Sequence, residues 1–232
     1  MSTKTTVVLV ERRLSERLYK LVRILCLVLH RPNGLKYREA IIETWGKRCQ
    51  TILFFLGGNA SNVERLNSFA YLVTLYMNDS YDAAPTKLRL AIAFVKQNYS
   101  RTFDWLFLSD DDAFVVLENL RFFLLRQDPT KPEYFGFKFA PFHGYTSGGP
   151  GCAVSAHNFP KMAEAFATGN CSSPTGYGDV ATGSCLRSVG IRPGDSRDSH
   201  GRHTFFPLTL QDALNGGFPG WLIQYTPFPI NQ

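Results

Sequence analysis

Three consecutive aspartates, Asp110 to Asp112, follow the apolar segment FDWLFLS near the middle of the chain. Carboxylates this close together repel one another, which raises their pKa values unless a cation lies among them. A hard divalent ion with oxygen ligands is the usual partner of such a group. The alternative is an ordinary strand-end turn or helix N-cap, because Asp is favoured in both.

Neighbouring residues exclude two aspartate motifs. A phosphatase of the D-x-D-x-T type needs Thr where this chain has Phe114, and an EF-hand loop needs Asp or Asn there, followed by Gly. What remains is an Asp-x-Asp pair that binds a divalent ion, and the ion would neutralise the diphosphate of a nucleotide leaving group.

The elements around the aspartates predict a sheet that places them at a ligand-binding edge. Apolar runs at 21–29, 51–58 and 105–108 are typical of strands buried on both faces. Helical spacing follows at 35–49, around 63–76 and at 86–99. This alternation predicts an α/β fold with a mostly parallel sheet, whose ligands bind beyond the carboxyl ends of the strands. In the second half we expect a short strand at 134–139 and helices at 116–128, at 158–168 and from Asp179.

Composition indicates a globular chain. With 232 residues, 44% hydrophobic and 19% charged, it can bury the core of one domain. Residues 1–50 carry 11 Lys and Arg against 4 Asp and Glu, which suits either an anionic ligand or a solvated helix face. No basic stripe is interleaved with aromatic residues, so nucleic acid is not an expected partner. No apolar run reaches the length of a membrane span or a signal peptide.

Five cysteines leave the redox compartment open. None forms a C-x-x-C pair, so a zinc site is not expected. They could form two disulfides with one thiol left over, or remain five buried thiols. Four N-glycosylation sequons favour a secretory chain slightly, and they begin at Asn59, Asn78, Asn98 and Asn170.

Several motifs, taken in chain order, resemble those of one enzyme family. They are VRILCLVL, ETWGKRC, FDWLFLSDDDAFVVLENLRFFL, YFGFKFAPFHGYTSGGPGCAVS and GDVATGSCLRSVGIRPGDSRD. Together they resemble the β1,3-glycosyltransferase (fringe-like) superfamily, and within it the core 1 β1,3-galactosyltransferases, or glycoprotein-N-acetylgalactosamine 3-β-galactosyltransferases. The match covers roughly residues 20–210, and the GDSRD motif points to the core 1 family.

The resemblance implies a fold, an activity and a compartment. The fold would be of the glycosyltransferase A type, a Rossmann-like nucleotide-sugar-binding sheet flanked by helices. A single domain at 21–232, short at its C-terminus relative to the family, would follow a basic extension at 1–20. A Golgi membrane enzyme would transfer galactose from UDP-galactose to O3 of GalNAc on Ser/Thr of glycoproteins, with inversion and Mn²⁺. A homodimer is left open.

The resemblance also assigns roles to single residues near the aspartates. Asp110 and Asp112 would be the metal and diphosphate ligands, and Asp111 the neighbour that touches the nucleotide. Asp179 matches the family's catalytic base, which accepts the proton of the acceptor hydroxyl. Without the family, Asp179 would be interpreted as a helix N-cap.

Other matched residues lie further along the chain. Ser147, Gly148 and Gly149 match a loop on the acceptor side, where the lack of side chains lets the backbone approach a sugar. Trp45 matches a family tryptophan and is expected to pack in the core. Arg197 and Asp198 would either form an ion pair or contact the ligand. The family's cysteine pattern implies two disulfides, Cys26–Cys49 and Cys171–Cys185.

The chain departs from the family pattern at several points. Gly178 stands where the family has an acidic residue before the base, and Phe206 stands at the His of Phe-His-Pro. No histidine matches the family's metal ligand, since His200 and His203 lie off the motif. The membrane anchor and a later C-terminal strand are not matched. Two alternatives therefore stay open: a non-catalytic paralogue with a binding or chaperone-like role, and a fringe-like transferase with another donor or acceptor.

Overall fold

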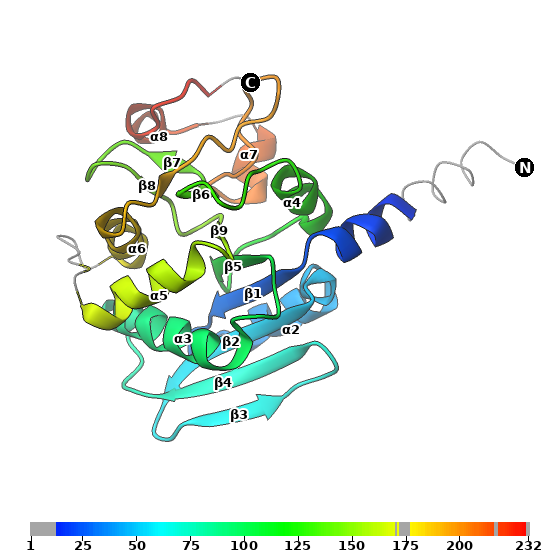
Figure 1. Ribbon diagram of the computed structural model, residues 1–232, viewed down its shortest axis with the longest axis vertical. Coiled ribbons are helices and arrows are strands. Elements are labelled where there is room, and N and C mark those ends of the chain that lie inside the picture. The colour runs from blue at the N-terminus through cyan, green and yellow to red at the C-terminus, as the bar shows by residue number, and fades with distance from the viewer. Residues whose placement is uncertain (1–12, 170, 172–176, 216–217, 231–232) are drawn as a thin grey trace, which may run out of the picture.

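A mixed sheet of eight strands forms the centre of the protein in the computed structural model (Figure 1), which describes residues 13–169, 171, 177–215 and 218–230. The strands lie in the order β10-β6-β9-β5-β1-β2-β4-β3. Their bounds are β1 Ile24–Leu29, β2 Thr51–Gly58, β3 Asn62–Arg65, β4 Ala70–Tyr76, β5 Trp105–Asp110, β6 Glu133–Gly136, β9 Cys152–Ser155 and β10 Arg192–Pro193. A separate two-stranded sheet consists of β7 Lys138–Phe139 and β8 Tyr145–Thr146.

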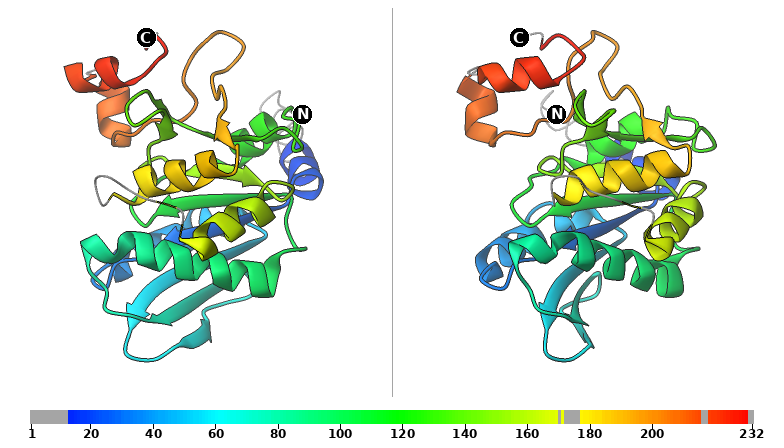
Figure 2. Two further views of the ribbon diagram at one scale, coloured as in Figure 1. Left: turned by 60° about the vertical axis from the view of Figure 1, so that its left-hand side comes forward. Right: turned by 90° about the vertical axis from the view of Figure 1, so that its left-hand side faces the viewer.

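Helices cover both faces of this sheet. On one face α3, α5 and α6 pack against one another and the strands, as Figure 2 shows, while α2 and α4 lie on the other face. A helical segment at 13–21 leads into β1. The bounds are α2 Leu35–Glu43, α3 Ala84–Tyr99, α4 Leu117–Leu124, α5 Phe159–Thr168, α6 Gly178–Ser188, α7 Leu210–Asn215 and α8 Gly220–Tyr225, with 3₁₀ turns η1 Gly46–Arg48 and η2 Tyr81–Ala83.

The central strands are apolar at nearly every position because both of their faces are buried. In β1, Leu25 and Leu27 point into the core beneath α3 and α5, whereas Cys26 and Val28 point into the core beneath α2 and α4. The same alternation holds in β2 and β5. Side chains of a strand alternate between its faces, so an apolar residue is required at every position. The interpretation of these runs as buried strands is therefore confirmed.

The prediction of a helix around 63–76 is wrong. That segment is an antiparallel hairpin of β3 and β4, and β4 also pairs in parallel with β2. The Asn67 side chain forms the turn by accepting hydrogen bonds from the backbone N–H groups of Phe69 and Ala70, both at 2.9 Å. Apolar residues of this segment fit both spacings, and pairing with β2 selects the strand.

The other half of the sheet is less parallel than expected. β1, β2, β4 and β5 pair in parallel, as the alternating pattern predicts, but β9 runs antiparallel between β5 and β6. The single strand expected at 134–139 divides into β6 and β7. The strand at 105–108 extends to Asp110, which places the first aspartate inside β5.

Both expected disulfides are present. Cys26 in β1 is bonded to Cys49 before β2, and Cys171 is bonded to Cys185 in α6. The remaining cysteine, Cys152, is a buried thiol whose pKa rises to about 12 because of burial. Of the four sequons, Asn59, Asn78 and Asn98 are exposed, and the fourth lies outside the described residues, as do residues 1–12 of the basic extension.

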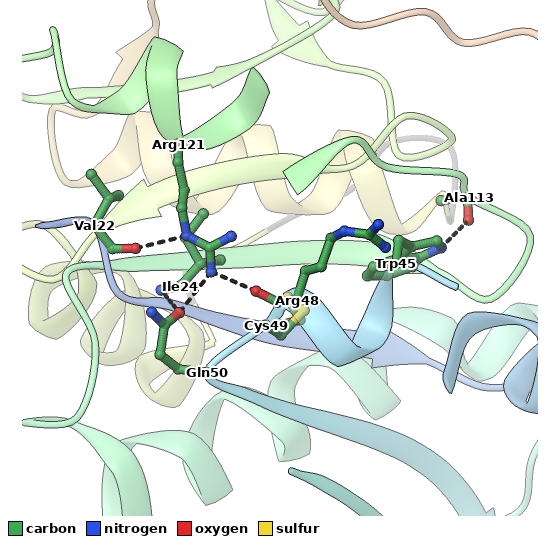
Figure 3. The surroundings of a disulfide bond; sticks show 9 residues. Val22, Ile24, Trp45, Arg48, Cys49, Gln50, Ala113 and Arg121 are labelled. Atoms are coloured by element: carbon green, nitrogen blue, oxygen red, sulfur yellow. Dashed lines mark hydrogen bonds between the residues drawn. A yellow bond between two sulfur atoms is a disulfide. The ribbon is translucent and has the colours of Figure 1, made fainter. Parts of the chain in front are cut away.

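Arg121 of α4 joins the elements around the first disulfide (Figure 3). Its side chain is buried, with Nε donating to the carbonyl of Val22 at 3.1 Å and Nη2 to the carbonyl of Arg48 at 2.6 Å. Nη2 also donates to Oε1 of Gln50 at 3.0 Å, and the guanidinium lies 4.9 Å from the ring centroid of Tyr19. Burial lowers the pKa of Arg121 to about 10. Arg121 thus connects α4, β1 and the entry to β2 with the helical segment at 13–21.

Replacing Arg121 with Met should lower the free energy of unfolding by about 3 kcal/mol. Methionine fills much of the volume but leaves the buried carbonyls of Val22 and Arg48 without their donor. Urea denaturation of the disulfide-intact protein measures the effect. The exposed Arg101 provides a matched control, and Arg101→Met should change stability by less than about 0.5 kcal/mol. Equal effects of the two substitutions would show that the buried guanidinium does not stabilise the fold.

Within the part of the chain that the structure describes, no helix is both long and apolar enough to cross a membrane.

Candidate active site

A cleft of about 750 Å³ opens at the carboxyl ends of β1 and β5. The two strands are in register with Leu29 opposite Asp110, so the loops that follow them enter the cleft side by side. All seven residues expected around the reacting groups line it, although they come from three separate segments: Asp110, Asp111, Asp112, Ser147, Gly148, Gly149 and Asp179. The juxtaposition of these segments is a result of the fold.

Asp110 carries the unbalanced charge of the cleft. Among the described residues, no hydrogen bond or ion pair reaches its carboxylate. Burial first, and then the charges of Asp112, Asp111 and Asp179, raise its pKa to about 6. A carboxylate without partners in such surroundings is stabilised by a bound cation.

The other two aspartates have protein partners. The side chain of Asp111 is only 1% exposed, and its Oδ2 lies 2.9 Å from Nδ1 of His30 and accepts from the backbone N–H of Arg31 at 3.0 Å. Arg31 Nε donates to Asp111 Oδ1 at 2.7 Å, while Nη2 donates to Asp112 Oδ2 at 2.7 Å. These contacts hold the pKa of Asp111 below its usual value despite burial. Asp112 is 54% exposed and lies at the cleft surface.

The glycine-rich loop crosses the end of β5. Gly151 has φ of +78°, and a Cβ there would lie 2.5 Å from Phe107, so only glycine fits. A Cβ at Gly148 would lie 3.7 Å from Asp110 Oδ2 and 3.4 Å from Asp179 Cβ. The side chains of Asp110 and Asp179 therefore both lie close to Gly148.

Asp179 lies in the first turn of α6. Its Oδ2 accepts from the Gly148 N–H at 3.2 Å and its Oδ1 from the Val180 N–H at 2.8 Å, which orient the carboxylate toward the loop. Burial outweighs these hydrogen bonds and raises the pKa of Asp179. A raised pKa makes a carboxylate a better proton acceptor near neutral pH. Asp179 is not the N-cap of α6, because Tyr177 occupies that position.

The donor groups fit a divalent ion in part. Asp110 and Asp112 offer oxygen ligands in a cleft lined by five carboxylates and two Lys or Arg side chains. Within the described part of the chain, however, no three His, Cys, Asp or Glu side chains are arranged to hold a metal ion. Magnesium-type ions are commonly held by one or two carboxylates together with substrate phosphates and water. With two aspartates, the cleft would need further oxygen ligands from phosphate or water to hold such an ion.

A second cleft of about 1140 Å³ adjoins the first and shares Asp112 and Gly149 with it. It lies between α4 and the segment at 197–209, and its wall is rich in phenylalanine. Arg197 and Asp198 line this cleft but do not pair with each other, because each has an ion pair of 2.7 Å elsewhere, with Asp195 and Arg202 respectively.

The histidines of this region do not line the aspartate cleft. His203 stacks on Phe137 with ring centroids 4.7 Å apart, and its Nε2 is buried without a hydrogen-bond partner. Phe206, at the motif's histidine position, also lines the second cleft. Trp45 is a core residue, as expected, and its indole N–H donates to the Ala113 carbonyl at 3.0 Å, directly after the aspartates (Figure 3).

Sequence reasoning missed the groups that follow β1. His30 and Arg31 surround Asp111, and Lys87 of α3 donates to the His30 carbonyl at 2.9 Å while pairing with the buried Asp79. The sequence did contain a pattern that could have indicated these residues. The rule that placed Asp110 at the carboxyl end of a strand places His30 and Arg31 at the end of the neighbouring strand.

The chain is similar in sequence to a curated galactosyltransferase. No family model matches the chain. A curated protein of Xenopus laevis, glycoprotein-N-acetylgalactosamine 3-beta-galactosyltransferase 1, is 31% identical over an alignment of 229 residues that covers 95% of this chain. The chain spans about 61% of the length of that relative. The sheet flanked by helices and the aspartates at its ligand edge agree with a glycosyltransferase A-type fold, and the similarity to this galactosyltransferase extends over nearly the whole chain.

Proposed function

We propose that this protein transfers galactose from UDP-galactose to O3 of GalNAc on Ser/Thr of glycoproteins, with inversion at the anomeric carbon. One observation carries the proposal. Asp179, the expected base, and Asp110, the expected diphosphate-side ligand, both lie close to Gly148 in one cleft. The name of the Xenopus relative supports the reaction class.

Asp179 would accept the proton of the acceptor hydroxyl. As that oxygen forms its bond to C1 of galactose, the bond from C1 to the diphosphate oxygen breaks, and UDP leaves with the bonding electrons. The hydrogen bonds from Gly148 and Val180 hold the Asp179 carboxylate in place during this transfer. Its raised pKa favours proton acceptance.

Asp110 and Asp112 would hold a divalent ion, Mn²⁺ by family resemblance. When bound, the ion neutralises the diphosphate of the donor and the charge that develops on the leaving group. Charge balance supports this assignment. The cleft is lined by five carboxylates and only two Lys or Arg side chains, so a diphosphate would otherwise be repelled.

The second cleft is the place that we assign to the acceptor glycopeptide. It meets the first cleft at Asp112 and Gly149, so a peptide bound there could extend its sugar toward the aspartates. Exposed aromatic and aliphatic side chains on its wall, Phe114, Val116 and Phe122, offer apolar contact to a peptide.

We place the reaction in the lumen of the Golgi. The two disulfides support an oxidising compartment, and the family's substrates are glycoproteins.

Two measurements on the disulfide-intact protein test the proposal. Calorimetric titration with UDP should show binding that requires Mn²⁺. Incubation with UDP-galactose, Mn²⁺ and a peptide carrying GalNAc on Thr should add one hexose by mass spectrometry. The matched control is the same peptide without GalNAc, which should gain no mass. UDP binding without transfer would instead support a non-catalytic binding protein, and no UDP binding by the folded chain would contradict the proposed donor.

A further inference from the structure

Arg31 is an exposed cation in the acidic cleft. Two Lys or Arg side chains are among the described residues that line the cleft, Arg31 and Lys87. Lys87 is 7% exposed and paired with Asp79, itself 7% exposed, so its charge is already compensated. Arg31 is 46% exposed, and its guanidinium reaches Asp112 at the cleft surface. Of these two cations, Arg31 is therefore the one that a ligand can contact.

Asp111 serves to hold Arg31. The carboxylate contacts three parts of the arginine: the backbone N–H, Nε and Nη2. His30 contacts the same carboxylate, and Gly34 has no room for a Cβ because that atom would collide with Asp111 Oδ2. The loop at 30–34 is thus wrapped around Asp111. These contacts fix the Nε side of the guanidinium and leave Nη2 to bridge toward Asp112.

Asp112 has two competing uses. It is paired with Arg31, and it is also one of the two carboxylates that we assign to the divalent ion. A half-exposed ion pair contributes little stability, so a divalent ion can displace the guanidinium. The displaced group would remain next to the ion, since Asp111 still holds Nε. A guanidinium presents N–H donors in a planar fork that matches phosphate oxygens.

We infer that Arg31 selects for diphosphate-bearing donors: it holds Asp112 before ligands bind, yields Asp112 to the divalent ion, and then donates to an oxygen of the nucleoside diphosphate. The inference rests on the proposed function, because it requires that a nucleoside diphosphate and a divalent ion bind this cleft.

Opposite effects on two ligands test this role. In Arg31→Ala, the affinity for Mn²⁺ alone should rise about fivefold, because the competitor for Asp112 is gone. The affinity for UDP at saturating Mn²⁺ should fall about tenfold, and the affinity for UMP should fall less, because UMP lacks the second phosphate. Calorimetry measures all three ligands, and the signal of free Mn²⁺ in electron paramagnetic resonance checks the first. Arg31→Lys keeps the charge without the fork and should give intermediate values.

Arg23 provides a matched control. It pairs with Asp104 at 2.7 Å and is 48% exposed, but it lies at the opposite ends of the same two strands. Arg23→Ala should leave all three affinities unchanged. If Arg31→Ala does not fold, Arg31→Lys carries the test with the same signs.

Three other outcomes would contradict the inference or the proposed function. A weaker affinity for both Mn²⁺ and UDP would indicate a purely structural role for Arg31 and overturn the inference. Wild-type binding of UDP with no change in either Arg31 variant would overturn the inference alone. No UDP binding by the folded wild-type chain would overturn the proposed function and the inference together.

Discussion

Replacing Asp179 with asparagine should reduce the rate constant of galactose transfer about 10³-fold and leave the affinity for UDP and Mn²⁺ within about twofold of wild type. Asparagine is nearly isosteric, and its carbonyl can still accept one of the two backbone hydrogen bonds from Gly148 and Val180. It cannot take a proton, which removes a contribution of typically 10²–10⁴. Single-turnover assays and calorimetry measure the two effects.

The pH profile gives a second readout for Asp179. Because burial raises its pKa, the wild-type rate should fall as the pH drops through that value and the carboxylate becomes protonated. The residual rate of the asparagine variant should lack this acidic limb. Asp128→Asn is the control, since Asp128 is a surface carboxylate bonded to Thr130, and its profile should match wild type. Unchanged transfer by Asp179→Asn would exclude Asp179 as the base.

Replacing Asp110 with asparagine should stabilise the metal-free protein at pH 7.5 by about 3 kcal/mol. The folded-state pKa of Asp110, about 6, lies above its ordinary value of 3.8. Ionised Asp110 is therefore less favourable in the folded protein than in the unfolded chain. As the pH rises from about 4 through about 6, the free energy of unfolding falls because this carboxylate must ionise in its buried site. A shift of about 2 pKa units corresponds to about 3 kcal/mol. The asparagine variant keeps this free energy of unfolding at high pH, because its side chain carries no charge.

Urea denaturation at two pH values measures this effect. The stabilisation by Asp110→Asn should be large at pH 7.5 and nearly absent at pH 4, and the same variant should lose Mn²⁺-dependent UDP binding. Asp112→Asn is the control in the same cleft. Its exposed carboxylate is paired with Arg31, so the substitution should not stabilise the protein. An equal gain for Asp110→Asn at both pH values would contradict the assigned cause.

Much of the central fold could be predicted from the sequence. The runs that became β1, β2 and β5 are apolar at every position because both of their faces are buried, and that requirement is visible in the residues. The hairpin at 62–76 could not be predicted in the same way. Its apolar residues suit either period, and it became a strand because the edge of β2 was open for pairing.

The site shows the same division between sequence and structure. The residues themselves indicate a cation at Asp110–Asp112, and the resemblance brings Asp179 and the loop at 147–149 to the same cleft. Arg31 was not predicted, although it follows a recognised strand. Its contacts to Asp111 and Asp112 join residues 80 and 81 positions apart, which no local pattern reveals.

The sequence by itself determined that three carboxylates lie at the ligand edge of the sheet, since the apolar strand that precedes them fixes them at the carboxyl end of β5. The tertiary structure alone decided which partner each carboxylate has. The register of β1 against β5 sets Leu29 opposite Asp110 and brings the loop at 30–34 onto Asp111. As a result, Asp111 is enclosed, Asp112 is paired and Asp110 remains without a partner among the described residues, because each carboxylate is stabilised only by the groups that the fold places beside it.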